Sequence, residues 1–535
     1  MKRTYLLLLL FLTIGITSQS QQLLTVAEKS NFLSTSTHAE VLDFIGQLLK
    51  TSPFIKVENI AITTEGKEVP MLVIANPLPE SAKYLKNDKR IVVYVQANIH
   101  SGEVEGKEAS LMLARDLLKD PNSEIMKNVV VLIVPNLNAD GNDKMSVKNR
   151  TNQNGPQNGV GVRYNGQFLD LNRDAMKLET PEISGVVGKI FNVWDPAITV
   201  DCHTTNGSYH EEPVTFTWMM NPNGSRNLIN FMRDKMMPSV HDNLRGNYKV
   251  ENLFYGEFVE RLDLDKGWIS EASETRYLVN YIGVRNRLAI LNENYVYADY
   301  KTRVQGCYFL LRTILDYASA NKNDILKILQ RADEQLVNRN FEAGKDSFAI
   351  EYKGVPTPEK ITIKAYEADT IPGAKGYWRY RQSDRKRTVT VPYIADYFPT
   401  KSIKMPFAYI LAIPDKDVLD NLKKHGIEVE KLSKFLNASV ERFKIIELKG
   451  AERLNQGHYT QTVKGEFIAE VKEFPIGTYL VKTNQKLGNL AACLLEPQSD
   501  DGLLLWNFFD KYLVPQWGGD FFPYPVYRLM EKTDL

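Results

Sequence analysis

Short apolar runs recur along the first 300 residues of this 535-residue chain, and segments of helical length separate them. The runs are rich in β-branched residues and are bounded by turn-forming residues, which is typical of buried strands. They comprise Met71–Ala75, Arg90–Gln96, Val129–Val134, Ala197–Cys202 and Leu288–Leu291. Apolar strands that alternate with helices predict an α/β fold, in which helices sandwich a mixed, mostly parallel sheet.

The segments between these runs carry apolar residues at helical spacing. Helices are expected at Thr37–Leu49, between Glu105 and Lys119, and at Pro181–Phe191, Ser225–Asn243, Tyr300–Ala320 and Asn321–Asn340. Residues 149–167 are instead rich in Asn, Gly and Gln. This stretch predicts a long surface loop, and such loops often shape sites on α/β folds.

The pattern changes near residues 325–350, where a domain boundary is expected. Residues 21–340 are predicted to form one domain, and residues 345–535 a C-terminal α+β region of unknown role. Expected elements of this region are the strands Ser347–Ile363, Thr388–Val391, Ala408–Ile413 and Lys444–Leu448, and the helix Asp415–His425. The aromatic tail Trp506–Tyr527 is interpreted as a packed core or domain interface rather than a ligand-stacking surface.

Composition excludes several classes of protein. Charged residues make up 24% and hydrophobic residues 43%, which disfavours a disordered chain, a collagen or a coiled coil. Lys and Arg number 66 against 65 Asp and Glu, and this balance argues against a nucleic-acid partner. The three cysteines, Cys202, Cys307 and Cys493, are too few and too scattered for a disulfide framework or a zinc ribbon.

The N-terminus reads as a secretory signal peptide. A basic head, Met1–Arg3, precedes an apolar run to Gly15, and Ser18 and Ser20 precede a plausible cut before Gln21. The apolar run is shorter than the ~20 residues of a spanning helix, and no later stretch is long and apolar enough. We therefore expect residues 1–20 to be removed and the mature chain to be exported, periplasmic or secreted, with no stable membrane span.

A His-x-x-Glu pair, His100 and Glu103, follows the strand that ends near Gln96. Open α/β sheets place ligands at the carboxyl ends of their strands, and imidazole and carboxylate are ordinary zinc donors. The pair by itself is also compatible with a helix-capping Glu beside an ordinary His. A second histidine, His203, follows the strand Ala197–Cys202, which supplies the third donor of a catalytic zinc site.

Two further groups fit hydrolytic chemistry. Glu293 follows the apolar run Leu288–Leu291 and would serve as the base, unless it is an exposed carboxylate at the end of a strand. Arg173, beside the polar loop, would bind an anionic substrate end through its guanidinium, or would form a surface salt bridge.

Taken together, these residues resemble the zinc carboxypeptidase family, the metallocarboxypeptidases related to carboxypeptidase A. The resemblance covers roughly residues 35–320. The matching pieces, in order, are His100-x-x-Glu103, Asn138-Ala-Asp140-Gly141, Asp170-Leu-Asn172-Arg173, His203 and Glu293. The sequence departs from the family pattern at Asp174, because the family usually has Asn-Arg-Asn where this chain has Asn172-Arg173-Asp174.

The resemblance implies a role for each piece. Zinc would be bound by His100, Glu103 and His203, with Asp170 orienting His100. Asn172 and Arg173 would hold the terminal carboxylate of the substrate. The resemblance also requires a further arginine from the loop, for which Arg150 is favoured over Arg163, and a capping tyrosine, either Tyr277 or Tyr281.

The sequence therefore predicts an exported zinc-dependent peptidase that hydrolyses peptide bonds as a carboxypeptidase. Zinc would activate a water molecule, and Glu293 would act as general base. Two alternatives remain open. One is a zinc amidohydrolase, deacylase or cell-wall peptide endopeptidase on the same fold. The other is a catalytically silent binding protein that kept the fold.

Overall fold

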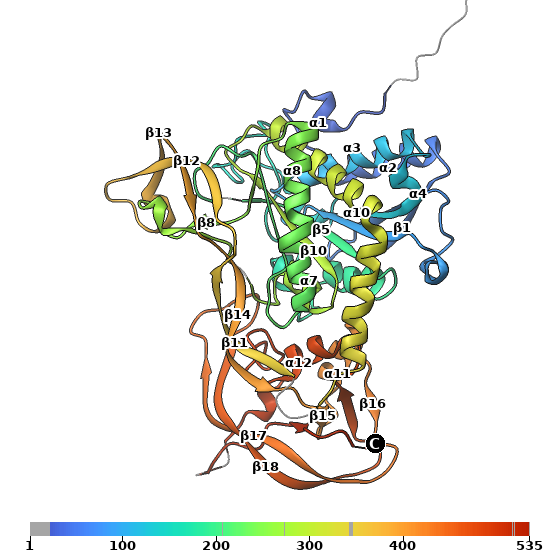
Figure 1. The fold of residues 1–535 in the computed structure, drawn as a ribbon, viewed down its shortest axis with the longest axis vertical. Helices are drawn as coiled ribbons and strands as arrows, with labels where there is room; N and C mark the ends of the chain where they lie inside the picture. Colours follow the sequence, from blue (N-terminus) through green and yellow to red (C-terminus); the bar gives the residue numbers. More distant parts are fainter. Residues whose placement is uncertain are drawn as a thin grey trace, which may run out of the picture.

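The computed structural model describes residues 22–533 apart from residues 206, 272, 342–345, 516 and 518. The predicted signal peptide, residues 1–20, lies outside the described residues. Within the described part of the chain, no helix combines the length and the apolar character needed to cross a membrane. Figure 1 shows an α/β body, coloured blue to yellow, with most of the C-terminal region, coloured orange to red, below it, whereas strands β12 (Ile361–Thr370) and β13 (Tyr380–Val391) lie beside the body.

A sheet of eight strands lies at the centre of the described chain, in the order β1-β2-β4-β3-β5-β10-β6-β7 (Figure 1). The neighbours β4-β3-β5-β10 run parallel, as do β6 and β7, whereas the other neighbours are antiparallel. The strands are β1 (Ile55–Ile62), β2 (Glu68–Ile74), β3 (Ile91–Ala97), β4 (Val129–Val134), β5 (Ile198–Thr205), β6 (Val214–Trp218), β7 (Asn252–Phe254) and β10 (Leu288–Tyr295). The predicted mixed, mostly parallel sheet is confirmed.

The predicted ends of two central strands are wrong. β5 and β10 continue past their apolar runs and stay paired until Tyr295 lies opposite Thr205. His203 therefore lies within a strand rather than after it, and Glu293, expected at a strand end, lies inside β10. The reason is that the backbone ladder continues although the side chains have become polar, because those side chains line a cavity at this end of the sheet.

Helices and short helical turns connect these strands. The helices of the body are α1 (Val26–Lys29), α2 (His38–Thr51), α3 (Glu105–Lys119), α4 (Glu124–Asn128), α5 (Ala139–Asn142), α6 (Pro181–Gly185), α7 (Arg226–Phe231), α8 (Met237–Tyr248), α9 (Leu278–Val284) and α10 (Tyr300–Val337). Two predicted helices, Pro181–Phe191 and Ser225–Asn243, contain π-helical turns at Val186–Phe191 and Met232–Met236. As predicted, residues 149–167 contain no helix or strand. A short 3-10 turn follows at Leu171–Arg173.

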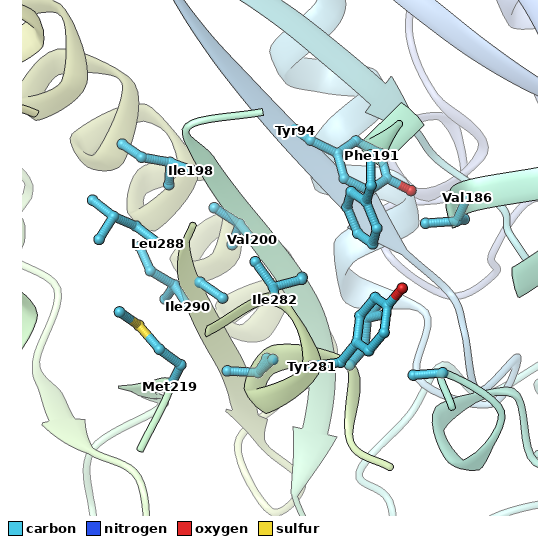
Figure 2. Packing of buried hydrophobic residues seen from close by; sticks show 14 of the residues in the cluster. Tyr94, Val186, Phe191, Ile198, Val200, Met219, Tyr281, Ile282, Leu288 and Ile290 are labelled. Carbon is cyan, nitrogen blue, oxygen red and sulfur yellow. The ribbon is translucent and has the colours of Figure 1, made fainter. Parts of the chain in front are cut away.

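Both faces of the sheet are packed against helical segments. On one face, the ring of Tyr94 from β3 lies 6.1 Å from that of Phe191, and Phe191 lies 6.3 Å from Tyr281 of α9 (Figure 2). On the other face, the Sγ atom of Cys202 in β5 lies 4.0 Å from the Sγ atom of Cys307 in α10. Because side chains alternate between the two faces along each strand, the apolar runs are buried on both sides.

The two helices predicted between Tyr300 and Asn340 form one element. Helix α10 runs without a break from Tyr300 to Val337, and only Asn321 departs from helical geometry, with φ −112° and ψ 15°. The Asn321 side chain donates a hydrogen bond to the carbonyl of Tyr317, one turn earlier. A lone Asn therefore bends the helix here without ending it, since no Pro or Gly accompanies it.

Beyond α10, the described chain is mostly antiparallel sheet. A four-stranded sheet joins β11 and β14 to two short strands of the body, β8 and β9 (Glu257–Phe258 and Trp268–Ile269), and β12 pairs with β13. A six-stranded sheet follows in the order β16-β19-β15-β20-β17-β18. The bounds are β11 (Ser347–Pro356), β12 (Ile361–Thr370), β13 (Tyr380–Val391), β14 (Tyr393–Lys404), β15 (Ala408–Leu411), α11 (Lys416–Lys424), β16 (Glu430–Lys431), β17 (Leu436–Gly450), β18 (Gln461–Phe474), β19 (Tyr479–Lys482), α12 (Gly488–Leu495) and β20 (Val526–Leu529).

The aromatic tail is only partly packed inside this region, and Phe522 is among its exposed side chains. Trp506, Phe509 and Tyr524 are buried, whereas Trp517 is fully exposed. The domain boundary expected near residues 325–350 stays a prediction. Strand β14, which follows the expected boundary, pairs with strand β9, which precedes that boundary.

Candidate active site

His100, Glu103 and His203 form a buried cluster at the carboxyl ends of β3 and β5. The Nδ1 atoms of the two histidines lie 3.2 Å apart, and Glu103 Oε2 lies 3.2 Å from His100 Nδ1 and 3.0 Å from His203 Nδ1. The structure thus brings together the three residues that the sequence predicts as metal ligands.

A tight turn after β3 presents two of these side chains. Asn98 adopts a left-handed backbone conformation with φ 63°, and its side-chain amide donates hydrogen bonds to Asn136 and Asn142. The Glu103 backbone N–H then donates to the carbonyl of His100. Asparagine tolerates this conformation better than most residues, so the chain leaves the strand sharply and both ligands face the same point.

Each imidazole is oriented by a carboxylate on its far side. His100 Nε2 lies 2.9 Å from Asp170 Oδ1, and His203 Nε2 lies 3.0 Å from Asp201 Oδ2. With a metal bound, each imidazole would donate its Nε2–H group to its acid and present an unprotonated Nδ1 atom to the cluster. Nitrogen and carboxylate lone pairs that converge in this way fit a zinc ion in both donor chemistry and number.

The charges around the cluster favour ionised carboxylates. Burial opposes ionisation of Glu103, but His100 and Arg150 lower its pKa well below the usual value. Burial likewise opposes ionisation of Asp170, and His100 and Arg163 hold its pKa below the usual range. Both groups are therefore available as anions, one as a metal donor and one as a hydrogen-bond acceptor.

A cavity of about 1000 Å³ opens onto this cluster. Polar and charged side chains make up much of its wall near the sheet: His100, Glu103, Arg163, Asn172, Arg173, His203, Thr204, Thr205, Tyr255, Tyr277 and Glu293. The volume suits several residues of a peptide, and the cluster lies on its wall. The geometry therefore describes a substrate cavity with a metal centre.

Glu293 lies on β10 directly opposite His203 on the neighbouring strand β5. Its side chain lines the cavity. Burial raises the pKa of Glu293 to about 8, the nearby Glu103 carboxylate adds to the rise, and His203 opposes it. The side chain faces the same space as the metal cluster, and a cation bound there would lower this pKa and favour the ionised form that a base needs.

Asn172 and Arg173 lie on the cavity wall, within a 3-10 turn at Leu171–Arg173. The Asn172 side-chain oxygen accepts a hydrogen bond of 3.0 Å from the backbone N–H of Leu278. The Arg173 guanidinium lies over the Tyr277 ring, 4.4 Å from its centre. A guanidinium held in this way is suited to bind a carboxylate.

The unusual Asp174 is directed into the protein. Its carboxylate accepts hydrogen bonds from the backbone N–H and the hydroxyl of Thr180, and it forms an ion pair of 3.3 Å with Lys177. These contacts compensate most of its charge, so the departure from the family pattern at this position leaves Arg173 facing the cavity.

The two loop arginines occupy different positions. Arg150 donates to Glu103 Oε1 at 2.9 Å and to the Thr204 carbonyl, and a Cβ atom at Gly102 would lie 2.3 Å from its Cδ atom. Arg163 forms a bond of 2.8 Å with Asp170 and lines the cavity. Arg150 thus contacts the metal cluster through the carboxylate of Glu103. Its role in binding substrate stays a prediction.

Two residues of the site were not predicted from the sequence. Asp201 precedes His203 by two positions on β5, so the period-two alternation of a strand was a usable signal for it. Tyr255, at the end of β7, lines the cavity without any sequence signal. Of the two candidate capping tyrosines, Tyr277 lies on the cavity wall, whereas Tyr281 is buried and its hydroxyl lies 2.7 Å from His425 Nδ1.

Comparison with known proteins finds similarity to zinc carboxypeptidases. The family model described as "Zinc carboxypeptidase" (Peptidase_M14) matches residues 41–222. "Carboxypeptidase 2" of Trichophyton equinum is 22% identical over 498 residues, which cover 87% of this chain and 81% of that protein. "Carboxypeptidase 2" of Trichophyton rubrum is 21% identical over 533 residues, which cover 94% of this chain and 88% of that protein.

Among solved structures, the metallo-carboxypeptidase from Burkholderia cenocepacia is 17% identical, with a TM-score of 0.40. The similar part covers 53% of this chain and 70% of that one. A zinc metallopeptidase is the class of protein that the sheet, the cluster and the family match define together. Residues 41–222 of this chain match the zinc carboxypeptidase family model, and 87% of the chain aligns with a protein named as a carboxypeptidase.

Proposed function

We propose that this protein is an exported carboxypeptidase that hydrolyses the C-terminal peptide bond of peptides. One observation carries the proposal. A single cavity holds the His100–Glu103–His203 cluster, the carboxylate of Glu293 and the guanidinium of Arg173. A metal centre, a base and an anchor for an anion are the three parts that the removal of a C-terminal residue requires.

Zinc held by the three ligands would polarise the scissile carbonyl group and lower the pKa of a water molecule toward neutrality. Glu293 accepts a proton from the attacking water and passes it to the nitrogen of the leaving amine as the C–N bond breaks. Arg163 stabilises the negative charge that develops on the carbonyl oxygen. Asp170 and Asp201 keep the two imidazoles in the orientation and tautomer that the ligands need.

The choice of the C-terminal bond is attributed to Asn172 and Arg173. The terminal carboxylate of a peptide is an anion with planar, bidentate geometry, which a guanidinium matches. Tyr277 restricts the Arg173 guanidinium to the cavity wall, so that less conformational entropy is lost when the carboxylate binds. A peptide held by its carboxylate would present its last peptide bond to the cluster.

Export rests on the basic head and apolar run within residues 1–20. Expression of the full chain in a secreting host, followed by N-terminal sequencing, tests this part. The expected mature N-terminus is Gln21. Recovery of the intact leader on a protein that stays in the cytoplasm would contradict export but not the peptidase function.

Mass spectrometry of a peptide mixture tests the reaction itself. We expect products shortened by single C-terminal residues, no products after treatment with a chelator, and recovery on adding zinc. Cuts within the peptides would favour an endopeptidase, and cleavage of acylated amino acids alone would favour a deacylase. A zinc-loaded protein that yields no products from any of these substrates would indicate a binding protein.

A further inference from the structure

The far wall of the substrate cavity is made by the C-terminal region. Lining residues from this region are Ile350, Glu351, Tyr352, Tyr397, Thr400 and Asp500. They come from β11, from β14 and from the segment after α12. The cavity that opens onto the metal cluster is therefore bounded by two parts of the chain that are far apart in sequence.

We propose that the C-terminal region is part of the substrate-binding site, and that Asp501 is the positioning residue that holds the segment Ser273–Leu278 in the cavity wall. This inference rests on the proposed function, because it concerns how the same cavity binds its peptide. It assigns a role to a region for which the sequence predicts none.

The Asp501 carboxylate binds both the backbone N–H and the side chain of Arg276. Asp501 is fully buried, and its Oδ2 atom accepts a hydrogen bond of 2.7 Å from the Arg276 backbone N–H. Its Oδ1 atom lies 2.9 Å from Arg276 Nε. A buried carboxylate that binds both groups fixes the position and the direction of this segment of chain.

The residues that follow Arg276 reach the proposed carboxylate anchor directly. The Tyr277 ring lies beneath the Arg173 guanidinium, and the Leu278 N–H binds the side-chain oxygen of Asn172. Both contacts depend on the position of the backbone at residues 276–278. A shift of this segment would therefore release Arg173 and Asn172 without touching the metal ligands.

A second contact of the C-terminal region reaches the other side of the same anchor. The backbone N–H of Asp170 donates a hydrogen bond of 2.8 Å to the side-chain oxygen of Gln456, between β17 and β18. Nearby, His458 Nε2 lies 3.0 Å from the Glu179 carboxylate. The C-terminal region thus holds both segments that carry the anchor, residues 170–173 and residues 276–278.

Neighbouring contacts extend the same wall. The hydroxyl group of Tyr352 donates a hydrogen bond to the Asp500 carboxylate, and both residues line the cavity. The Asn221 side-chain amide donates to the carbonyl of Ser273 and to Tyr352. Strand β11, the segment after α12 and the segment Ser273–Leu278 therefore form one hydrogen-bonded wall.

The test compares Asp501→Asn and Asp501→Ala with Asp333→Asn in the full-length, zinc-loaded protein. Asp333 is a matched control, because it is also a buried aspartate that binds an arginine, with distances of 2.9 and 3.1 Å to Arg287. Neither Asp333 nor Arg287 lines the cavity. Loss of either pair is expected to lower the melting temperature, so stability alone does not distinguish them.

The distinguishing readouts are KM, kcat and hydrogen–deuterium exchange. For both Asp501 variants we expect KM for a peptide with a free carboxylate to rise about tenfold or more, with kcat within about threefold of wild type. Exchange at the amides of residues 274–278 should become faster. Asp333→Asn should leave KM and this exchange unchanged, and all three variants should keep their zinc.

Two results would overturn the inference. One is an Asp501→Asn protein with the KM of the Asp333 control. The other is unchanged exchange at residues 274–278. If Asp501→Ala does not fold, Asp501→Asn carries the comparison, because Asn keeps the size of the side chain and removes the charge that pairs with the Arg276 guanidinium. A wild-type protein that cleaves no peptide would instead contradict the proposed function, and exchange would still decide whether Asp501 holds the segment.

Discussion

The Nδ1 atoms of His100 and His203 face each other at 3.2 Å, while the Nε2 atom of each ring is turned outward onto a carboxylate. In the tautomer that zinc binding requires, two unprotonated nitrogens and the Glu103 oxygen then converge without a hydrogen-bond donor of their own. Such an arrangement costs free energy through repulsion of lone pairs unless a cation lies between them.

The purified protein is therefore expected to carry about one equivalent of zinc. Replacing either histidine by alanine removes a donor, so zinc content and peptidase activity should be lost together. Elemental analysis alongside an activity assay checks this. Wild-type zinc content and activity in His100→Ala would contradict the proposed metal centre.

Asp201→Asn tests a residue found only in the structure. The change keeps the shape of the side chain but removes the charge that holds His203 Nε2–H. Loss of such a supporting group usually weakens metal binding about 10- to 100-fold. Zinc affinity should be measured by competition with a chelator. Asp333→Asn, which alters a buried aspartate elsewhere, is the control and should bind zinc as the wild type does.

Glu293→Gln separates the base from the ligands. Glutamine keeps the shape of the side chain but accepts no proton at neutral pH, so kcat should fall at least ~10²-fold. Zinc content and melting temperature should stay near wild type. Glu103→Gln, in contrast, should lose zinc together with activity. If Glu293→Gln loses zinc as well, Glu293 is a ligand; if it stays fully active, the base lies elsewhere.

Arg173→Ala tests the carboxylate anchor. Removing a charged hydrogen-bond donor typically costs about 1.5–3 kcal/mol, so kcat/KM for peptides with a free C-terminus should fall roughly 10- to 100-fold. Peptides amidated at the C-terminus should be poor substrates for both proteins. Arg385→Ala, on the exposed hairpin β12–β13, is the control and should not change kcat/KM. An equal loss on both kinds of peptide would contradict the anchoring role.

Glu182→Gln tests a buried carboxyl group outside the site. Burial raises the pKa of Glu182 from 4.5 to about 7, and one of its oxygens has no hydrogen-bond partner. The native state therefore retains this proton at a higher pH than the unfolded state. The stabilising contribution is complete below about pH 4.5 and is lost as the pH rises to about 7.

The difference between the two pKa values corresponds to roughly 3 kcal/mol at most. Glutamine is uncharged at every pH, so the variant should gain stability relative to the wild type between pH 5 and pH 8. Denaturant unfolding of both proteins at these two pH values measures the effect. A difference in stability that does not change with pH would contradict the assignment.

The sequence alone predicted the central strands and the order of the site residues along the chain. Val129–Val134 forms a strand with the predicted bounds, because a run of β-branched residues buried on both faces has few other stable conformations. The position of His100 and Glu103 after β3 was likewise predictable from the local sequence. The turn between them and the strand depends on neighbouring residues such as Asn98.

Only the tertiary structure shows which side chains contact those residues. The contact of Asp201 with His203 lies within β5, whereas the hydrogen bonds from Arg276 to Asp501 and from Asp170 to Gln456 join elements that the sequence had not connected. The last two join residues 225 and 286 positions apart. Hydropathy and spacing describe a residue against its near neighbours only, whereas the two long-range contacts exist because packing of the C-terminal region against the α/β body brings distant segments together.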